Sequence, residues 1–295
     1  MTTAAPAQPG RIATLRGMAW MVAAGFLFCL LNTILRVLSR ELDPFQTQFL
    51  RYLFGLIVLI PFMVRTGLAA WRPHDLPGQA WRGVLHTAGL LLWFWALPHV
   101  PMADMTAIGF TGPIFIMAGA VLFLGEAMVP ARWISAGIGF LGVLIIVAPQ
   151  FTGGGDAFWS LVMLSSAPLF AASFLITKAL TRRDRPEVIV AWQAITVAAF
   201  SLPFALPGWS WPTTEQWGWF LLTGLLGSAG HWCLTEAFRV ADMSATQPIR
   251  FVDMIWASTL GWLVFAEIPA STTFAGAAVI FAATTWIARR EALHR

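Results

Sequence analysis

The best candidates for chemistry in this sequence are polar residues that interrupt long apolar runs. Gln247, Arg250 and Asp253 are spaced three apart, so on a helix they lie along one face. Arg250 and Asp253 can pair, which lowers the cost of burying both charges. The pair either attaches its helix to a neighbour or belongs to a polar stripe lining a cavity, where Arg250 would face a carboxylate of a bound molecule.

Two histidines also lie inside apolar runs. His86 and Trp93 are seven residues apart and therefore share one helix face. Ser228, His231 and Thr235 form a second polar stripe. A histidine in such a run is either a hydrogen-bonded packing residue or a group that contacts a substrate or changes its protonation. We include His86, Trp93 and His231 among the candidate binding residues.

Two further polar positions complete this set. Asn32 is buried by its position, so its amide needs a partner, either in helix packing or in a cavity. Gly109, Gly112 and Pro113 interrupt another apolar run near its middle and predict a kink. A kink there would expose Thr111 and nearby backbone carbonyls. The candidate binding residues are Asn32, His86, Trp93, Thr111, His231, Gln247, Arg250 and Asp253.

The elements that carry these residues are predicted to be membrane helices. Of the 295 residues, 58% are hydrophobic and only 11% are charged, whereas soluble domains carry about 25% charged residues. Such a chain lacks the polar side chains to cover a water-soluble globule. A spanning helix needs roughly 20 mostly apolar residues. We expect ten of them, at residues 17–38, 44–64, 81–97, 103–124, 133–148, 157–180, 187–206, 217–238, 243–265 and 272–288.

The basic residues are distributed unevenly between the connecting loops. With the N-terminus in the cytoplasm, fourteen of the eighteen Lys and Arg residues, Arg82, Arg132 and Lys178 among them, fall toward the cytoplasmic side. The outer loops receive only Arg40, and Arg51 is expected at the membrane interface. Because positive charge favours cytoplasmic loops, we expect a multi-pass protein of the cell's inner membrane with both termini inside. The net charge of +4 then implies no nucleic-acid partner.

The sequence contains an internal repeat. Residues 96–126 return as residues 237–267 at an offset of 141 (267−126), and the segments ADMTA and ADMSA, at 103–107 and 241–245, share an offset of 138 (241−103). Five helices per half is an odd number, so the second half starts from the opposite side of the membrane. We therefore predict an all-α integral membrane protein with ten transmembrane helices in two inverted five-helix repeats.

The predicted organisation has four parts. They are a cytoplasmic tail at 1–16, a first repeat at 17–148, a second repeat at 157–289 and a cytoplasmic tail at 290–295. Glu126 and Glu267 end the fourth and ninth predicted helices on opposite sides of the membrane. Their position at helix boundaries favours hydrogen bonding to loops and helix ends over a role in ion coupling.

This pattern resembles the drug/metabolite transporter superfamily and, within it, the EamA-type exporters. In the second half, Met254 stands where the repeat predicts proline, and Ala266 replaces the glycine before Glu267. The resemblance implies a basket-like bundle around a central cavity. The matching residues are Ala96, Ala103, Thr106, Pro113, Leu124, Gly125, Glu126, Gly137, Gly139 and Gly142.

The resemblance also implies a secondary transporter that works by alternating access, and not an enzyme. Because only Arg250 is clearly buried among the basic residues, we favour export of amino acids or similar zwitterions over doubly charged phosphates. Asp253 and Arg250 would then face an ammonium and a carboxylate. Nucleotide sugars, sugar phosphates and drug-like cations are alternative substrates, and a channel or a membrane enzyme is an alternative class, although no hydrolase or metalloprotease motif is present.

The remaining expectations concern partners. No cofactor, no catalytic residue and no metal ligand is expected, and the sequence has no Walker motif that would bind ATP. The expected partners are a small-molecule substrate and the lipid bilayer, with protons as a candidate coupling ion. The sequence gives no indication of the oligomeric state.

Overall fold

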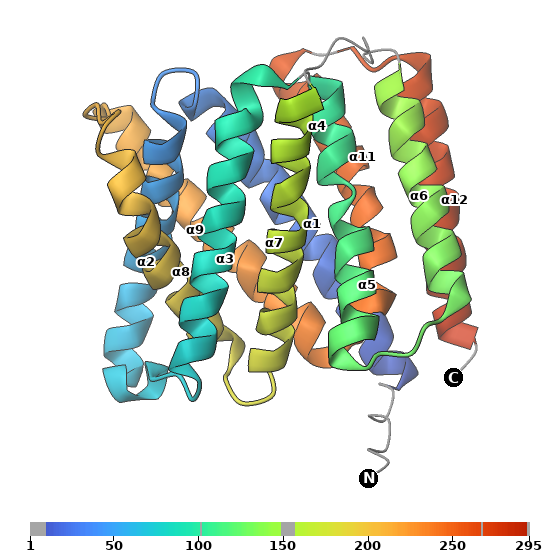
Figure 1. The fold of residues 1–295 in the computed structure, drawn as a ribbon, viewed down its shortest axis with the longest axis horizontal. Helices are drawn as coiled ribbons and strands as arrows, with labels where there is room; N and C mark the ends of the chain where they lie inside the picture. The colour runs from blue at the N-terminus through green and yellow to red at the C-terminus, as the bar shows by residue number, and fades with distance from the viewer. Residues whose placement is uncertain (1–9, 101, 149–156, 267, 294–295) are drawn as a thin grey trace.

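The computed structural model describes residues 10–100, 102–148, 157–266 and 268–293, and the regular elements within these ranges are all helical. Figure 1 shows them side by side across one bundle. The first half contains α1 (Arg11–Leu38), α2 (Pro44–Thr66), η1 (Leu68–Trp71), α3 (Leu76–Ala96), η2 (Leu97–His99), α4 (Met102–Gly109), α5 (Gly112–Leu124) and α6 (Pro130–Val147). The second half contains α7 (Ala157–Leu180), α8 (Pro186–Ala205), α9 (Thr214–Val240), α10 (Met243–Thr246), η4 (Gln247–Val252), α11 (Asp253–Phe265) and α12 (Ser271–Leu293).

These elements form ten membrane-crossing segments among the described residues. Six helices, α1, α2, α6, α7, α8 and α12, are each long and apolar enough to cross a membrane. Two more, α3 and α9, are 21 and 27 residues long. The last two crossings are interrupted helices, α4 with α5 and α10 with η4 and α11. The all-α membrane fold and its ten crossings are therefore as the sequence predicts.

The two interrupted helices occupy equivalent places in the two halves. The first break falls at the predicted kink, because α4 ends at Gly109 and α5 starts at Gly112 with Pro113 in its first turn. The second contains Pro248, at the start of the 3₁₀ segment η4. Proline lacks a backbone N–H and so cannot continue the hydrogen-bond ladder of an α-helix. Broken helices free backbone groups in the middle of a bundle, a recurring device of transporter sites.

The packing of the helices has the two-fold relation expected of an inverted repeat. Helix α1 packs along α9 and α3 along α7, and these pairs exchange when the halves are exchanged. A Cβ built on Gly230 would lie 2.8 Å from the ring of Phe28, and one built on Gly89 would lie 3.0 Å from the ring of Phe170. The glycines differ by 141 positions (230−89) and the phenylalanines by 142 (170−28). The same close contact is thus built twice, which confirms the two repeats.

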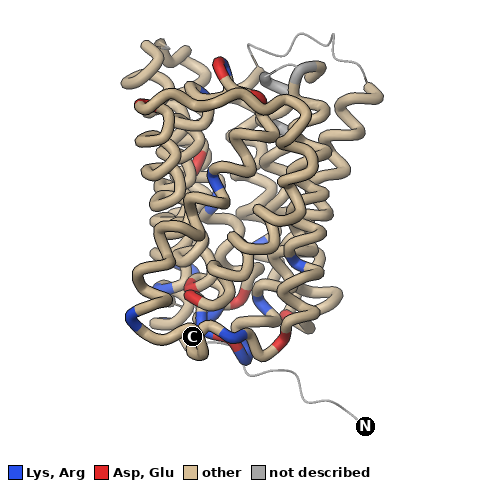
Figure 2. The backbone as a smooth tube through the Cα atoms, turned by 90° about the vertical axis from the view of Figure 1, so that its left-hand side faces the viewer, with Lys and Arg blue, Asp and Glu red and all other residues tan. Residues whose placement is uncertain are grey.

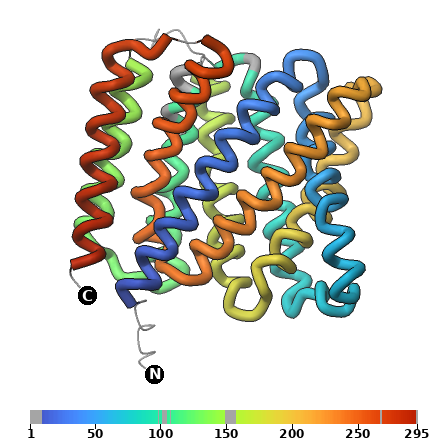
Figure 3. Tube along the Cα trace, turned by 180° about the vertical axis from the view of Figure 1, so that it is seen from behind, coloured from blue at the N-terminus to red at the C-terminus, as the bar shows by residue number. Residues whose placement is uncertain are grey.

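Helix α1 begins and helix α12 ends at the same end of the bundle, which we call the terminus end (Figures 1 and 3). Figure 3 also shows α1 running between α11 and α9. Lys and Arg residues gather toward the terminus end (Figure 2). This is the charge asymmetry that the loops of the sequence predict. We call the other end of the bundle the opposite end.

Candidate substrate cavity

The candidate site is a cavity of about 380 Å³ between the two halves. Its wall includes four phenylalanines, of which Phe28 on α1 and Phe170 on α7 come from equivalent places in the repeat. Phe110 joins them from the break between α4 and α5. The ring of Phe28 lies 4.9 Å from that of His231, and the ring of Phe170 lies 5.3 Å from that of His86. The cavity therefore offers flat apolar surfaces from both repeats.

One side of the cavity carries charge of both signs. Arg250 Nε and Asp253 Oδ2 are 3.9 Å apart, and their side chains are 27% and 18% exposed. The predicted pair thus forms and faces the cavity. The absence of a side chain at Gly25 on α1 makes room for the Asp253 carboxylate, because a Cβ at this position would lie only 1.8 Å from Asp253 Oδ1. Arg51 adds a second cation, whose guanidinium lies 4.5 Å from the centre of the Tyr52 ring.

A polar cluster closes another side of the cavity. Tyr52 Oη lies 2.9 Å from His86 Nε2 and 3.5 Å from His231 Nε2. Gln193 Nε2 lies 3.4 Å and 3.5 Å from the same two nitrogens. The two imidazole centres are 5.9 Å apart. The structure thus brings together two histidines that belong to different repeats and that the sequence offered only as separate candidates.

The other predicted residues are divided between the cavity and its surroundings. Asn32 lines the cavity, and Trp93 lines an adjoining cavity of about 460 Å³ that shares Phe110 with it. Two residues lie outside the described lining of both cavities. The Thr111 hydroxyl donates to Ile108 O over 2.6 Å at the helix break. Gln247 is fully buried in η4, so the polar stripe predicted with Arg250 and Asp253 does not extend to it. Substrate binding by the eight candidates stays a prediction.

The sequence did not predict the place of several residues in and behind the cavity wall. Arg51 lines the cavity although its place near a helix start indicated the membrane interface. Arg82, counted with the cytoplasmic charges, is buried inside the bundle with 1% exposure. Tyr52 is the only tyrosine of the chain, a signal that could have singled it out. Gln193 is a polar residue inside an apolar run, but its partners come from other helices, so spacing along one helix does not predict its place beside the histidines.

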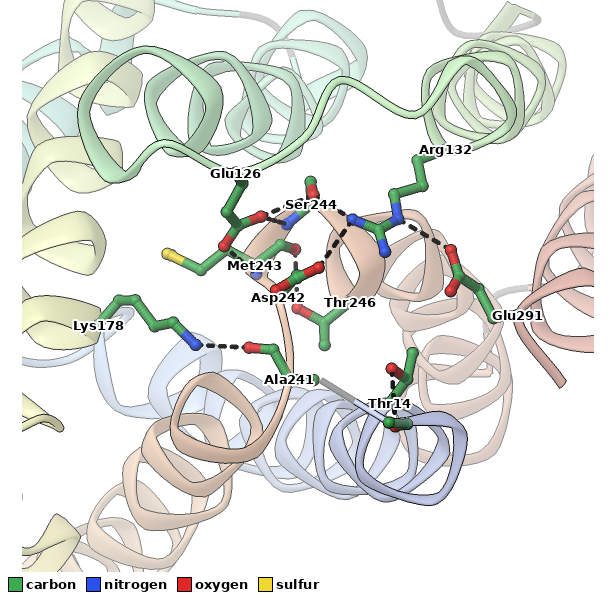
Figure 4. A network of polar contacts seen from close by, with 11 residues as sticks. Thr14, Glu126, Arg132, Lys178, Ala241, Asp242, Met243, Ser244, Thr246 and Glu291 are labelled. Carbon is green, nitrogen blue, oxygen red and sulfur yellow. Dashed lines mark hydrogen bonds and ion pairs between the residues drawn. The ribbon is translucent and has the colours of Figure 1, made fainter. Parts of the chain in front are cut away.

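The terminus end of the bundle is closed by polar contacts between the halves (Figure 4). Glu126 Oε1 accepts a hydrogen bond from the backbone N–H of Met243 over 2.6 Å. Its Oε2 accepts from the N–H and the hydroxyl of Ser244 over 2.9 Å and 2.6 Å. This confirms helix-end hydrogen bonding for Glu126. Glu267 lies outside the described residues.

Arg132 makes the second set of contacts at this end. Its side chain is fully buried, and Nε donates to Glu291 Oε1 over 2.9 Å. Nη1 donates to Ser244 Oγ over 2.7 Å and to Asp242 Oδ2 over 3.2 Å. Arg132 belongs to the first half and its partners to the second. We call the contacts of Glu126 and Arg132 the terminus-end network.

Further contacts seal the same end. Lys178 Nζ donates to the carbonyls of Phe238 and Ala241 at the end of α9, the second over 2.6 Å. Gly17 on α1 packs against Ala241, since a Cβ built on it would lie 2.4 Å from Ala241 Cβ. The adjoining cavity, in contrast, is lined by Pro269 and other residues near the opposite end. The cavity system is therefore closed toward the terminus end and extends toward the opposite end.

Across residues 10–100, 102–148, 157–266 and 268–293, no group of three or more His, Cys, Asp or Glu side chains could hold a metal ion. Cys29 and Cys233 are free thiols, and Cys29 lines the central cavity. The arrangement is suited to reversible binding of an organic molecule between apolar rings and a charged edge.

Comparisons with known proteins agree with this architecture. A model of the EamA-like transporter family matches the chain twice, at residues 15–148 and 157–289. A riboflavin transporter of Rhizobium johnstonii is 38% identical over 278 residues, which are 93% of this chain and 91% of that protein. An S-adenosylmethionine uptake transporter of Rickettsia prowazekii is 27% identical over 277 residues, 94% of each chain.

Two further similarities extend this set. A pseudopaline exporter of Pseudomonas aeruginosa is 27% identical over 276 residues, 93% of this chain and 96% of that protein. A solved crystal structure matches with a TM-score of 0.80 at 17% identity, covering 96% of this chain and 99% of the other, which shows the shared fold. This chain therefore belongs to the EamA-like transporter family of the drug/metabolite transporter superfamily and is a membrane transporter, not an enzyme.

Proposed function

We propose that this transporter carries a flat heteroaromatic metabolite through the central cavity, with riboflavin as the first candidate. The observation that carries the proposal is the aromatic wall contributed by both repeats. Phe28 and Phe170 present rings from equivalent positions, and Phe110 adds a third. Aromatic rings stack favourably on planar ring systems at small cost in conformational entropy. A substrate with a large flat ring fits such a wall better than a small amino acid does.

The size and polarity of the cavity support the same substrate class. A volume of about 380 Å³ lies in the range of sites for small organic ligands. Asn32, Arg51 and Asp253 supply donors and acceptors at the cavity wall. A flavin carries ring nitrogens, carbonyls and a hydroxylated chain that need such partners. The relative of 38% identity is named as a riboflavin transporter.

The second candidate substrate is an amino acid or a similar zwitterion. It is favoured by the Arg250–Asp253 pair, whose separation of 3.9 Å leaves each group available to a partner of opposite charge. A carboxylate would face Arg250 and an ammonium Asp253. Export of amino acids is the specific form of this candidate.

The proposed transport cycle is alternating access, in a protein of the inner membrane with both termini in the cytoplasm. Lys and Arg residues gather at the terminus end, which the positive-inside rule places in the cytoplasm (Figure 2). The cavity system then extends toward the outside. Opening to the cytoplasm requires Glu126 to release Met243 and Ser244, and Arg132 to release its partners.

Uptake into liposomes tests the proposal. Purified protein is reconstituted and supplied with labelled riboflavin or with a panel of labelled amino acids, with and without a pH gradient. We expect saturable riboflavin flux with counterflow and weaker flux of amino acids. Saturable amino acid flux without riboflavin flux would select the second candidate. A flux that follows the pH gradient would identify protons as the coupling ion, and non-saturable flux would contradict a carrier.

Two phenylalanine variants test whether the aromatic residues of the cavity wall bind the substrate. Phe170→Leu removes a ring from the cavity, whereas Phe281→Leu removes one from the surface of α12, where Phe281 is 64% exposed. We expect the first change to raise the KM for riboflavin severalfold and the second to leave it unchanged. Equal effects of both changes would remove the wall from substrate binding.

A further inference from the structure

We propose that Arg82, which lies behind the cavity wall, is a positioning residue. Acting through Gln193, it fixes which nitrogen of His86 and of His231 carries the proton. The substrate readout of this proposal rests on the proposed function, whereas its direct readout concerns the two imidazole rings alone.

Arg82 fixes the orientation of the Gln193 amide. Arg82 donates from Nη2 to Gln193 Oε1 over 2.6 Å. Its Nε donates to Thr177 Oγ1 over 2.6 Å and its Nη1 to the carbonyl of Ile189 over 2.8 Å. A guanidinium has donors and no acceptor. The oxygen of Gln193 must therefore face Arg82, and its NH₂ group must face away.

The orientation of the Gln193 amide in turn determines which nitrogen of each imidazole accepts a hydrogen bond. The NH₂ group of Gln193 lies 3.4 Å from His86 Nε2 and 3.5 Å from His231 Nε2. An amide NH₂ only donates, so a nitrogen that faces it is favoured as an acceptor. A neutral imidazole whose Nε2 accepts carries its proton on Nδ1. Both rings are thus assigned the Nδ1–H form.

The groups around His86 agree with this assignment. His86 Nδ1 lies 3.3 Å from Ser173 Oγ, which is also within 3.4 Å of the carbonyl of Arg82. Ser173 can donate to that carbonyl and accept from His86 Nδ1–H. His231 Nδ1 has no hydrogen-bond partner among the described residues, so a proton there would be unpaired, and the assignment of this ring depends on the Gln193 NH₂ group at Nε2 alone. The series of hydrogen bonds thus begins at the guanidinium of Arg82 and ends at the backbone carbonyl of the same residue.

The consequence at the cavity concerns Tyr52. Its hydroxyl is 2.9 Å from His86 Nε2, and because that nitrogen accepts, the Tyr52 proton is directed to it. Tyr52 lines the cavity, and its oxygen is left with lone pairs only. This wall therefore selects a substrate group that donates a hydrogen bond, such as an imide or amide N–H.

The test is nitrogen NMR of the full chain in lipid nanodiscs with ¹⁵N-labelled histidine. The chain has five histidines, and the signals are assigned with His86→Asn and His231→Asn. We expect the Nδ1–H form for both rings. In Gln193→Glu, the carboxylate still pairs with Arg82 and cannot donate, so His231 is expected to change to the Nε2–H form. Nε2–H forms in the unmodified protein, or an unchanged His231 in Gln193→Glu, would overturn the proposal.

Riboflavin transport gives the second readout. A purely structural role for Gln193 predicts that Gln193→Glu is tolerated, because Arg82 keeps its acceptor. The positioning role predicts a rise in KM of about tenfold with an unchanged amount of folded protein, and a similar rise in Arg82→Met. An unchanged KM in Gln193→Glu would contradict selection by this wall. Failure to detect any riboflavin flux in the unmodified protein would refute the substrate and leave the NMR result to decide the tautomers.

Discussion

At the scale of single residues, the Arg250–Asp253 pair is partly buried and faces the central cavity. The two groups are only partly exposed, and the cavity gives each a second direction in which to find a partner. A pair that served only to join helices would be better covered. Its place on the cavity side of η4 and α11 is therefore the reason to expect a role in transport.

We expect Arg250→Ala to lower the initial transport rate at least tenfold while the yield of folded protein in the membrane falls much less. Removing the guanidinium takes away a cavity donor, and Asp253 can be neutralised by taking up a proton. The measurement is transport in liposomes normalised to folded protein by gel filtration in detergent. A parallel loss of both quantities would show that the pair only stabilises the fold.

A second residue-scale prediction concerns the ends of the two broken helices. Gly125 ends α5 with φ of 70°, and its repeat equivalent Ala266 ends α11 with φ of 55°. The left-handed region costs a residue with a Cβ about 1 kcal/mol relative to glycine. Ala266→Gly is expected to raise the free energy of unfolding by about that amount, and Gly125→Ala to lower it comparably.

Thermal unfolding in detergent measures this pair of changes. The two variants serve as controls for each other, since the same exchange is made in opposite directions at equivalent positions. A lower melting temperature for Ala266→Gly would contradict the strain assigned to Ala266.

At the scale of the elements, the terminus-end network joins the start of α10 to the end of α5 and the start of α6. Glu126 accepts from two backbone N–H groups and one hydroxyl, which a glutamine can only partly replace. We expect Glu126→Gln to shift the protein toward the conformation that is open at the terminus end. Hydrogen bonds to a charged acceptor are about twice as strong as neutral ones, so the shift should be measurable.

The native Cys29 reports this shift, because it lines the central cavity. In a Cys233→Ser background, an impermeant thiol reagent is applied to either side of reconstituted membranes. Glu126→Gln should react faster than its parent from the terminus side and more slowly from the opposite side. Faster reaction from both sides would indicate general loosening of the bundle instead.

The element scale is also where sequence-based prediction was most successful. The composition and the loop charges predict ten crossings because each crossing depends on the residues of its own segment and of the adjacent loops. Gly109, Gly112 and Pro113 predict the first break from backbone chemistry alone. The proximity of His86 and His231 is different, since it depends on where α3 and α9 lie relative to each other in the assembled bundle. No spacing along one helix carries that information. The same holds for Arg82, whose three acceptors come from α7 and α8.

At the scale of the whole molecule, the two-fold relation predicts the topology. The loop after α1 lies at the opposite end and the loop after α7 at the terminus end (Figure 1). In a background of Cys29→Ser and Cys233→Ser, we expect Arg40→Cys to react with an impermeant reagent from outside the cell. Arg182→Cys should react only after the membrane is permeabilised. Reaction of both from the same side would contradict the inverted repeats.

The terminus-end network is not repeated in full by the second half. The position equivalent to Arg132, 141 residues later (273−132), is Thr273, near the start of α12. A conformer that closes at the opposite end therefore gives up the ion pairs of Arg132 and has no guanidinium at the equivalent position to replace them. The empty carrier should accordingly spend most of its time facing the outside. Reorientation of the cavity toward the cytoplasm would then depend on the free energy of substrate binding. The return of the empty transporter to the outward-facing conformation would be favourable in free energy.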